Sequence, residues 1–392
     1  MNSALNVKEL IGERVRGLQE YAPEPLEEAA LRLGLPLGQL IKLDANENPY
    51  GPTKRALAAL NGYSNYHRYP DALSRRLRQA IGRYVGVDPA YILVGNGSDE
   101  LIDSVLRLFR PGPRGGGIAQ VINCPPTFGE YQFYALSNDM EVVDVPRDES
   151  FRVDVAALEA LCRADPRPRV LFLASPNSPD GSTLPDADLE RLLDLPLVVV
   201  LDEAYIEFGA ASSKARLVAD PRPDRGPAPD PDRGGNLIVL RTFSKWAGLA
   251  GLRVGYGIFP QALMGALWRL KSPYNVNCAA QVGALATLEN LGEAKETIAK
   301  IVAERERLIK KLREISFLKV YDSQANFLLC RAQGVAMETV RQAMERRGII
   351  LRYFSDPALQ DCVRITVGTP MQDESVLIAL RGLDRQGGIH GQ

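Results

Sequence analysis

The amino-acid sequence predicts an α/β protein in which a large domain has a mostly parallel sheet between helices, with a smaller α+β domain beside it. Short, continuously apolar runs alternate with helical patterns from about residue 117 to 259, and long charged helical patterns with short strands follow residue 275. Continuous apolarity is expected of strands that are covered on both faces. We therefore expect a large domain at 51–275, and a small domain at 1–50 and 276–392 that includes an N-terminal arm.

Six runs are the expected strands of the larger sheet. They are GIAQVINC (117–124), EVVDV (141–145), RVLFLAS (169–175), LPLVVVLDEAY (195–205), NLIVLRTFS (236–244) and VGYGIF (254–259). Ligands of parallel sheets bind beyond the carboxyl ends of the strands. Functional side chains are therefore expected directly after these runs.

Helices and loops are predicted around these strands. The spacing of the apolar residues Val7, Leu10, Ile11, Val15 and Leu18 predicts an amphipathic helix near the N-terminus. Residues 292–315 have the pattern of a long charged helix. The segments 111–117 and 219–235 are expected to be loops, and the second, which is rich in proline, is expected to be an exposed insertion.

The charge balance argues against nucleic-acid and membrane partners. The chain of 392 residues has 47 Lys and Arg against 48 Asp and Glu, a formal charge of −1, whereas nucleic-acid binding usually requires a basic excess. No apolar run approaches the roughly 18 residues of a membrane helix, and the N-terminus lacks the apolar core of a secretory signal. We expect a cytoplasmic protein.

Cysteine and histidine usage limits the chemistry further. Five widely spaced cysteines indicate reduced thiols rather than a disulfide framework or a zinc site. The only histidines are His67 and His390, so a catalytic histidine triad or a multi-histidine metal centre is not expected. His67 is interpreted as a surface or packing residue, and no metal is expected.

Lys245 is the first candidate for chemistry. It follows a buried run and precedes a glycine-rich apolar stretch, where a lysine amine is partly desolvated and able to attack a carbonyl; a surface lysine with an extended stem is the alternative. Between Asp232 and Glu289 the sequence has no acidic residue but several cations, Arg241 and Arg253 among them. This distribution favours an anionic ligand such as a phosphate.

Four other residues, two of which follow a glycine-rich turn, extend this pattern. The glycines of GLAGLRVG (248–255) have the wrong spacing for a dinucleotide motif, and no acid follows at about 20 residues. Ser98 and Asp99 follow a glycine-rich turn and open a helix, which either binds a phosphate or is simply capped. Asp202 ends a buried run and requires a cationic or protonated partner, in a ligand or in a salt bridge. Tyr205 lies three residues further on.

A nucleophilic lysine, an acid for a ring nitrogen, a tyrosine hydroxyl and a phosphate site are together what pyridoxal 5′-phosphate requires. The segment TFSKWAGLAGLRVGY (242–256) resembles the lysine segment of the fold type I aminotransferases. Eight motifs resemble, in order, those of the histidinol-phosphate aminotransferases: LDANENP (43–49), HRYPD (67–71), GNGSDE (95–100), PPTFGEY (125–131), SPNSPDG (175–181), LDEAYIEF (201–208), QANFLL (324–329) and VRITVGT (363–369). The resemblance covers about residues 20 to 370.

This resemblance implies a role for each candidate residue. Lys245 would carry the cofactor, Asp202 would pair with the pyridine nitrogen, and Tyr205 and Asn177 would contact the phenolic oxygen. Phe128 would stack on the ring, while Ser98, Asp99, Thr242, Ser244 and Arg253 would surround the phosphate. Tyr21, Asn46, Arg352 and Arg364 would bind the substrate, and Tyr69 would reach the partner's cofactor in a homodimer with shared sites.

The implied reaction converts L-histidinol phosphate and 2-oxoglutarate to imidazole acetol phosphate and L-glutamate, in histidine biosynthesis. An aromatic-amino-acid aminotransferase and a threonine-phosphate decarboxylase share most of these motifs and stay open as alternatives. A non-catalytic relative that binds pyridoxal phosphate and a nucleotide-dependent oxidoreductase are alternatives from other classes. The chain departs from the usual family pattern at Phe128, where a tyrosine is common, at Asp180, where a threonine is common, and in the length of 219–235.

Overall fold

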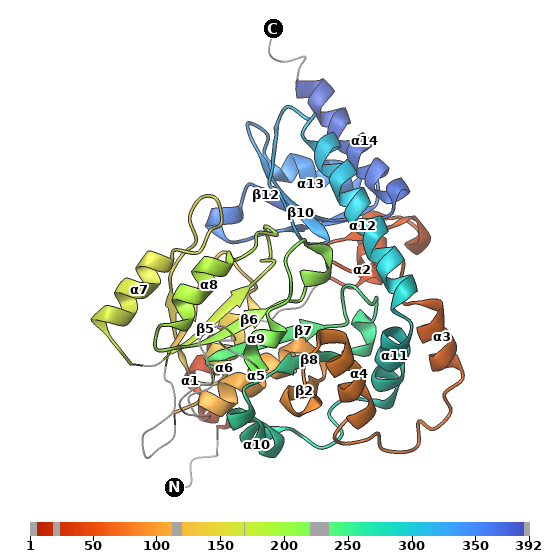
Figure 1. Ribbon diagram of the computed structural model, residues 1–392. Coiled ribbons are helices and arrows are strands. Elements are labelled where there is room, and N and C mark those ends of the chain that lie inside the picture. The colour runs from red at the N-terminus through yellow and green to blue at the C-terminus, as the bar shows by residue number, and fades with distance from the viewer. Residues whose placement is uncertain (1–5, 19–23, 112–119, 168, 220–234, 388–392) are drawn as a thin grey trace.

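Two β-sheets form the framework of the computed structural model, which describes residues 6–18, 24–111, 120–167, 169–219 and 235–387 (Figure 1). The larger sheet has the strand order β2 (Ile92–Gly95), β8 (Gly255–Ile258), β7 (Leu237–Thr242), β6 (Leu197–Asp202), β5 (Arg169–Ala174), β3 (Gln120–Asn123) and β4 (Glu141–Asp144). Strand β8 is antiparallel to both of its neighbours, and the other pairs are parallel. The predicted mostly parallel sheet is confirmed, and each of the six predicted runs contains one of its strands.

Helices cover both faces of this sheet because successive strand residues point to opposite sides. Val200 and Ile238 share one core with α5 (Gly97–Phe109), α6 (Glu130–Ser137) and α10 (Gln261–Leu270). Val199 and Val239 share the opposite core with α4 (Arg75–Val85), α7 (Val155–Ala164), α8 (Asp186–Leu193), α9 (Ala215–Ala219) and α11 (Cys278–Glu289). The continuous apolarity of the strand runs follows from this double coverage.

The smaller sheet has the order β1 (Ile41–Leu43), β11 (Ile349–Tyr353), β12 (Cys362–Thr366), β10 (Phe327–Ala332) and β9 (Leu318–Val320). It has its own core, with α12 (Leu291–Leu312), α13 (Met337–Glu345) and α14 (Pro370–Gly387) beside it (Figure 1). Strand β1 brings a segment from before residue 50 into this sheet. The boundaries of the two domains stay a prediction. The remaining helices are α2 (Leu26–Leu33) and α3 (Lys54–Asn61).

The N-terminal segment differs from the single amphipathic helix that its apolar spacing predicts. A 3₁₀ turn at Val7–Leu10 and the short α1 (Glu13–Arg16) are separated at Gly12, whose φ of −54° and ψ of 139° are not helical. Neither element has a buried residue. The predicted loop at 111–117 lies outside the described residues except for Pro111, and the insertion at 219–235 does so except for its two end residues.

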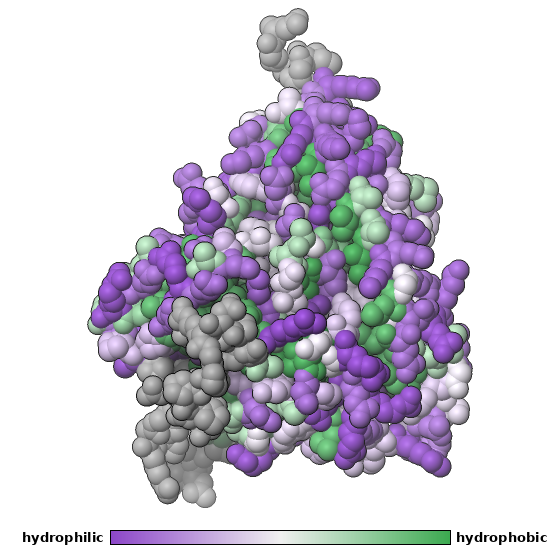
Figure 2. Space-filling model, in the orientation of Figure 1, coloured by the Kyte–Doolittle hydropathy of each residue, from purple (hydrophilic) through white to green (hydrophobic). Residues whose placement is uncertain are grey.

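Hydrophilic side chains cover much of the face in Figure 2, with hydrophobic residues visible mainly between them. All five cysteines are free thiols, and four of them are buried. His67 is exposed, as predicted, and His390 lies outside the described residues. Among the described helices, none has the length and apolar character that crossing a bilayer would require.

Candidate active site

A cavity of about 380 Å³ lies at the carboxyl end of the larger sheet. Strands β2, β3, β5, β6 and β7 all end there, because β2 and β7 are both antiparallel to β8 and therefore parallel to each other. Nine of the residues singled out from the sequence line this cavity: Ser98, Asp99, Phe128, Asp202, Tyr205, Thr242, Ser244, Lys245 and Arg253. The topology thus brings together segments that are more than 150 residues apart in the chain.

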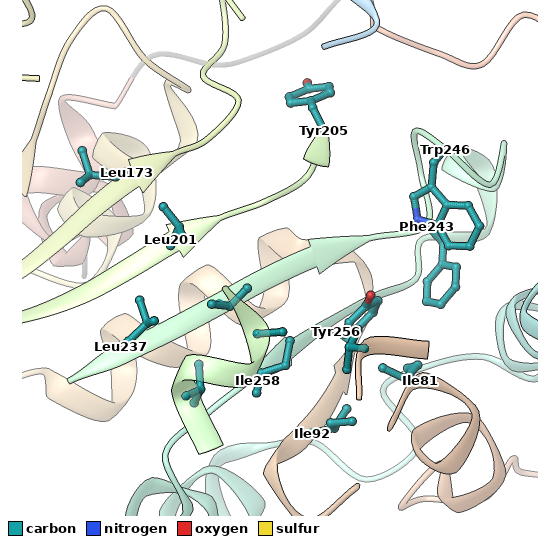
Figure 3. Packing of buried hydrophobic residues seen from close by; sticks show 14 of the residues in the cluster. Ile81, Ile92, Leu173, Leu201, Tyr205, Leu237, Phe243, Trp246, Tyr256 and Ile258 are labelled. Atoms are coloured by element: carbon teal, nitrogen blue, oxygen red, sulfur yellow. The ribbon is translucent and has the colours of Figure 1, made fainter. Parts of the chain in front are cut away.

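Lys245 lies just beyond β7, with its amine on the cavity side. Its Nζ donates a hydrogen bond to the Ala45 carbonyl oxygen over 3.0 Å and lies 5.8 Å from the centre of the Tyr205 ring. Its neighbours Phe243 and Trp246 are almost fully buried and pack together after the end of β7 (Figure 3). These two aromatic anchors hold the backbone that presents the lysine.

Asp202 is the last residue of β6 and is 4% exposed. Its Oδ2 accepts a hydrogen bond from the Tyr131 hydroxyl over 2.8 Å, and its Oδ1 accepts one from the Ala204 N–H over 3.0 Å. Burial raises the pKa of Asp202 to about 6, and these two hydrogen bonds act in the opposite direction. A buried carboxylate held by two neutral donors is suited to a protonated ring nitrogen.

Tyr205 lies past the end of β6, apart from the aliphatic side chains of the strands (Figure 3). Its hydroxyl oxygen accepts a hydrogen bond from Asn46 Nδ2 over 3.0 Å, which leaves the hydroxyl proton available for a group in the cavity. Asn46 itself is 1% exposed, and its backbone N–H donates to Thr366 Oγ1 over 3.0 Å. The structure therefore places Asn46 beside the Tyr205 hydroxyl, and the substrate contact expected of Asn46 stays a prediction.

A set of hydrogen-bond donors that suits an anion lines another side of the cavity. Thr242 Oγ1 donates to Ser244 Oγ over 2.9 Å, and the Arg253 guanidinium is held by Asp99 Oδ2 at 2.6 Å. Ser98 and Asp99 lie in the first turn of α5, where backbone N–H groups and the helix dipole favour a negative charge. Hydroxyls, a guanidinium and a helix N-terminus together fit a phosphate ester.

Two glycines allow the backbone to approach closely at this point. Gly97 has a φ of +81°, and a Cβ added there would lie 2.8 Å from Arg253 Nη2. A Cβ on Gly255 would lie 2.7 Å from the Ser98 backbone nitrogen. Any side chain at either position would fill the space around these donors.

Asn177 and Ser178 are neighbours in the loop after β5, and Ser178 is the one that lines the cavity. Asn177 is fully buried. Its Nδ2 donates to the Pro126 carbonyl oxygen and to an Asp180 carboxylate oxygen, and its Oδ1 accepts from Thr127 Oγ1. The amide nitrogen of Asn177 therefore already has two acceptors within the protein, and its contact with a phenolic oxygen stays a prediction.

Asp180, the unexpected acid of this motif, also faces away from the cavity. It is 2% exposed, and its Oδ2 accepts from the Ser182 N–H over 2.8 Å. Burial raises its pKa, while the nearby Arg147 guanidinium lowers it. The added negative charge is thus compensated inside the protein rather than presented to a substrate.

Arg352 and Arg364 are direct cross-strand partners on β11 and β12. Paired residues of antiparallel strands project from the same face. Arg364 Nη1 donates to Ser178 Oγ over 2.9 Å, and its Nη2 donates to the Asp44 carbonyl oxygen over 2.7 Å. Two guanidinium groups are therefore carried side by side on the smaller sheet, and one of them reaches a residue of the cavity wall.

Two predicted site residues remain, Tyr69 and Tyr21, and Tyr69 is not among the residues that line this cavity. Tyr69 is 81% exposed and stacks on Tyr274, with ring centres 4.5 Å apart. Tyr21 lies outside the described residues. Its predicted substrate contact stays a prediction, as does the partner-subunit role of Tyr69.

Three polar side chains of the cavity wall received no role from the sequence: Tyr131, Ser178 and Glu47. Tyr131 stands in PPTFGEY, one helical turn from Phe128, and its ring meets Phe128 edge to face. Glu47 belongs to LDANENP together with Ala45 and Asn46. Each of the three lies within one of the motifs named in the sequence analysis. A motif does not by itself show which of its side chains face the cavity.

The chain matches the sequence family described as aminotransferase class I and II over residues 38–382. It is 47% identical over 377 residues to the histidinol-phosphate aminotransferase of Roseiflexus castenholzii, covering 94% of this chain and 96% of that one. It is 41% identical over 367 residues to the chloroplastic histidinol-phosphate aminotransferase of Nicotiana plumbaginifolia, covering 93% and 84% respectively.

A solved structure shares the fold. The histidinol-phosphate aminotransferase of Sinorhizobium meliloti, in complex with pyridoxal 5′-phosphate, superposes with a TM-score of 0.80 at 25% sequence identity, covering 95% of this chain and 97% of that chain. The predicted fold class, with its two sheets and their helices, is confirmed by this likeness.

Proposed function

This chain belongs to the class I and II aminotransferases, and we propose that it converts L-histidinol phosphate and 2-oxoglutarate to imidazole acetol phosphate and L-glutamate. Relatives that are 41% and 47% identical over more than nine-tenths of the chain bear the name of this activity. The observation that carries the proposal is the position of Lys245 in one cavity with Asp202 and an anion-binding donor set. The product places the enzyme in histidine biosynthesis.

Pyridoxal 5′-phosphate is the cofactor that fits these residues. The hydroxyls of Thr242 and Ser244 and the Arg253 guanidinium suit its phosphate ester, and the carboxylate of Asp202 suits its ring nitrogen. Phe128, on the cavity wall, offers an aromatic face for the ring. When bound, the cofactor supplies the electron sink that stabilises negative charge at the substrate's Cα.

The protein's own groups move and hold the protons. Lys245 Nζ removes the proton from the Cα of the amine donor, and in the second half-reaction it delivers a proton to the Cα that becomes that of glutamate. Asp202 holds a proton on the ring nitrogen, and the Tyr131 hydroxyl favours the ionised form of that carboxylate. The Tyr205 hydroxyl, which already accepts from Asn46, turns its proton toward the cavity.

The two arginines bind the anionic part of each substrate. Arg352 and Arg364 lie opposite each other on neighbouring strands, and two guanidinium groups suit a phosphate dianion well. In the second half-reaction they bind a carboxylate of 2-oxoglutarate or glutamate. Arg364 already touches the Ser178 hydroxyl, so the anion is held next to the reacting end of the cavity.

A cytoplasmic homodimer is the form in which we propose that the enzyme works. Tyr69 is 81% exposed, and Val7 and Leu10 are each 67% exposed. An aromatic side chain as exposed as Tyr69 is available to a second copy of the chain, as the resemblance at HRYPD (67–71) implies. A second copy that covers them would bring Tyr69 toward a neighbouring cavity.

The direct test is an assay of the purified protein with histidinol phosphate and 2-oxoglutarate, in which glutamate is quantified. Phenylalanine, tyrosine and O-phosphothreonine are run in parallel at equal concentrations. The highest kcat/KM is expected with histidinol phosphate. Faster turnover of an aromatic amino acid, or release of CO₂ from phosphothreonine, would replace the proposal with one of the two alternatives.

A further inference from the structure

Glu47 is an acidic residue of the cavity wall to which the proposed reaction assigns no role. Three acidic side chains line the cavity in the described part of the chain: Glu47, Asp99 and Asp202. Asp202 is buried beside Tyr131, and Asp99 holds Arg253. Glu47, in contrast, has a side chain that is 50% exposed and pairs with Lys42, so it stands at the open part of the cavity.

The backbone that carries Glu47 is fixed by the reacting groups themselves. The carbonyl oxygen of Asp44 accepts from Arg364, and that of Ala45 accepts from Lys245. Asn46 supports Tyr205, and its own carbonyl oxygen accepts from Asn326 Nδ2 over 3.0 Å. The backbone just before Glu47 is therefore held by contacts with Lys245 and Arg364, and the Glu47 side chain lines the same cavity as Lys245.

One oxygen of this carboxylate remains available to a ligand. Lys42 Nζ donates to Oε2 over 3.0 Å. Oε1 has no hydrogen-bond partner among the residues that the structure describes, and Glu47 as a whole is exposed. A half-exposed carboxylate oxygen next to a reaction centre is a strong hydrogen-bond acceptor for an N–H group.

The proposed amine donor offers such a group. Its Cα carries one arm that ends in phosphate, which Arg352 and Arg364 bind, and one arm that ends in an imidazole ring. Neutral imidazole has one N–H donor, and imidazolium has two. We propose that Glu47 accepts a hydrogen bond from this imidazole and is the residue that selects it over a phenyl or phenol ring; this inference rests on the proposed function.

The same carboxylate has the opposite effect on the second substrate. Once the arginines bind one carboxylate of 2-oxoglutarate, the other carboxylate takes the place of the imidazole arm. Glu47 repels a like charge there. Removal of its charge therefore lowers turnover of histidinol phosphate without weakening the binding of 2-oxoglutarate, a combination that general damage to the cavity does not produce.

The experiment compares two donors that differ only in the ring, histidinol phosphate and 2-amino-3-phenylpropyl phosphate. In Glu47→Leu the ratio of their kcat/KM values should fall tenfold to a hundredfold, as expected for loss of one charge-assisted hydrogen bond. The KM for 2-oxoglutarate should stay the same or decrease. Glu47→Gln, which keeps an acceptor oxygen, should lie between Glu47→Leu and the wild type.

Lys42→Gln is the matched control, because it removes the ion pair and leaves the carboxylate. It should retain the wild-type preference for the imidazole donor. Equal loss of both donors in Glu47→Leu, or the same loss of preference in Lys42→Gln, would overturn the role of Glu47 while leaving the proposed function intact. If the wild-type enzyme does not use histidinol phosphate at all, the proposed function itself fails, and the inference fails with it.

Discussion

The Tyr131 hydroxyl donates a hydrogen bond to Asp202 Oδ2 over 2.8 Å at a point where both side chains are almost completely buried. Burial raises the pKa of the Asp202 carboxyl to about 6, and it raises the pKa of Tyr131 well above its usual value. The proton of this pair therefore belongs to the tyrosine at neutral pH. Asp202 is then the anion that a protonated ring nitrogen requires.

Replacement of Asp202 with Asn should reduce the chemical step about a thousandfold. A neutral amide does not hold a proton on the ring nitrogen, and a thousandfold loss corresponds to about 4 kcal/mol of transition-state stabilisation. Single-turnover kinetics with histidinol phosphate measure this step directly. A decrease of less than tenfold would mean that a different group maintains the ring proton.

The same replacement should stabilise the cofactor-free protein at neutral pH. Because the pKa of Asp202 is raised on folding, the folded state binds the proton more tightly, and stability decreases as the pH rises from about 4 to about 6. A shift of about two units corresponds to roughly 3 kcal/mol at pH 7. Thermal unfolding of both apoproteins between pH 4.5 and 7.5 checks this, and a wild type that becomes relatively more stable with rising pH contradicts it.

Arg352→Ala should raise the KM for histidinol phosphate about tenfold to a hundredfold, because a charge-assisted contact to phosphate is lost. Phenylalanine should be affected less, because its carboxylate carries one negative charge where the phosphate carries two. Arg331→Ala is the control from strand β10 of the same sheet, where the arginine pairs with Asp361 at 2.7 Å. Equal weakening of both donors by Arg352→Ala would favour an aromatic-amino-acid aminotransferase.

Tyr69 should act across the dimer interface. A mixture of Tyr69→Phe and Lys245→Ala subunits would form heterodimers in which one site lacks both residues and the other site has both. Activity above that of either parent is expected once subunit exchange has been shown by mass spectrometry. Exchange without recovery of activity argues that the sites are not shared.

The larger sheet was predictable because burial on both faces leaves a strong mark on the sequence. The run at 195–205 contains β6, and Asp202 at its end reaches the cavity because strand ends converge there. The structure of the N-terminal segment was not predictable in this way. Its apolar spacing indicates one helix, but the backbone of Gly12 is not helical and interrupts it. Local pattern therefore indicates which residues are apolar together, but not where a helix is interrupted.

The candidate site, too, was predictable only in part. Nine predicted residues line the cavity, since each follows a strand that ends at it or precedes one that begins there. Asn177 and Ser178 are adjacent in a loop, and nothing in their spacing tells which of them faces inward. Thr127 and Asp180 orient Asn177 by forming hydrogen bonds with its side-chain amide. The geometry of such contacts cannot be read from a sequence motif.

Lys245 is the group that moves the Cα proton, and the variant Lys245→Ala tests this role. The anion-binding set around Arg253 does not depend on the lysine, so the variant should still bind pyridoxal phosphate, now noncovalently. Glutamate formation from histidinol phosphate and 2-oxoglutarate is then measured for the variant and the wild type at saturating cofactor. Sustained turnover is expected of the wild type, and none of the variant. Ordinary turnover by the purified variant would contradict it.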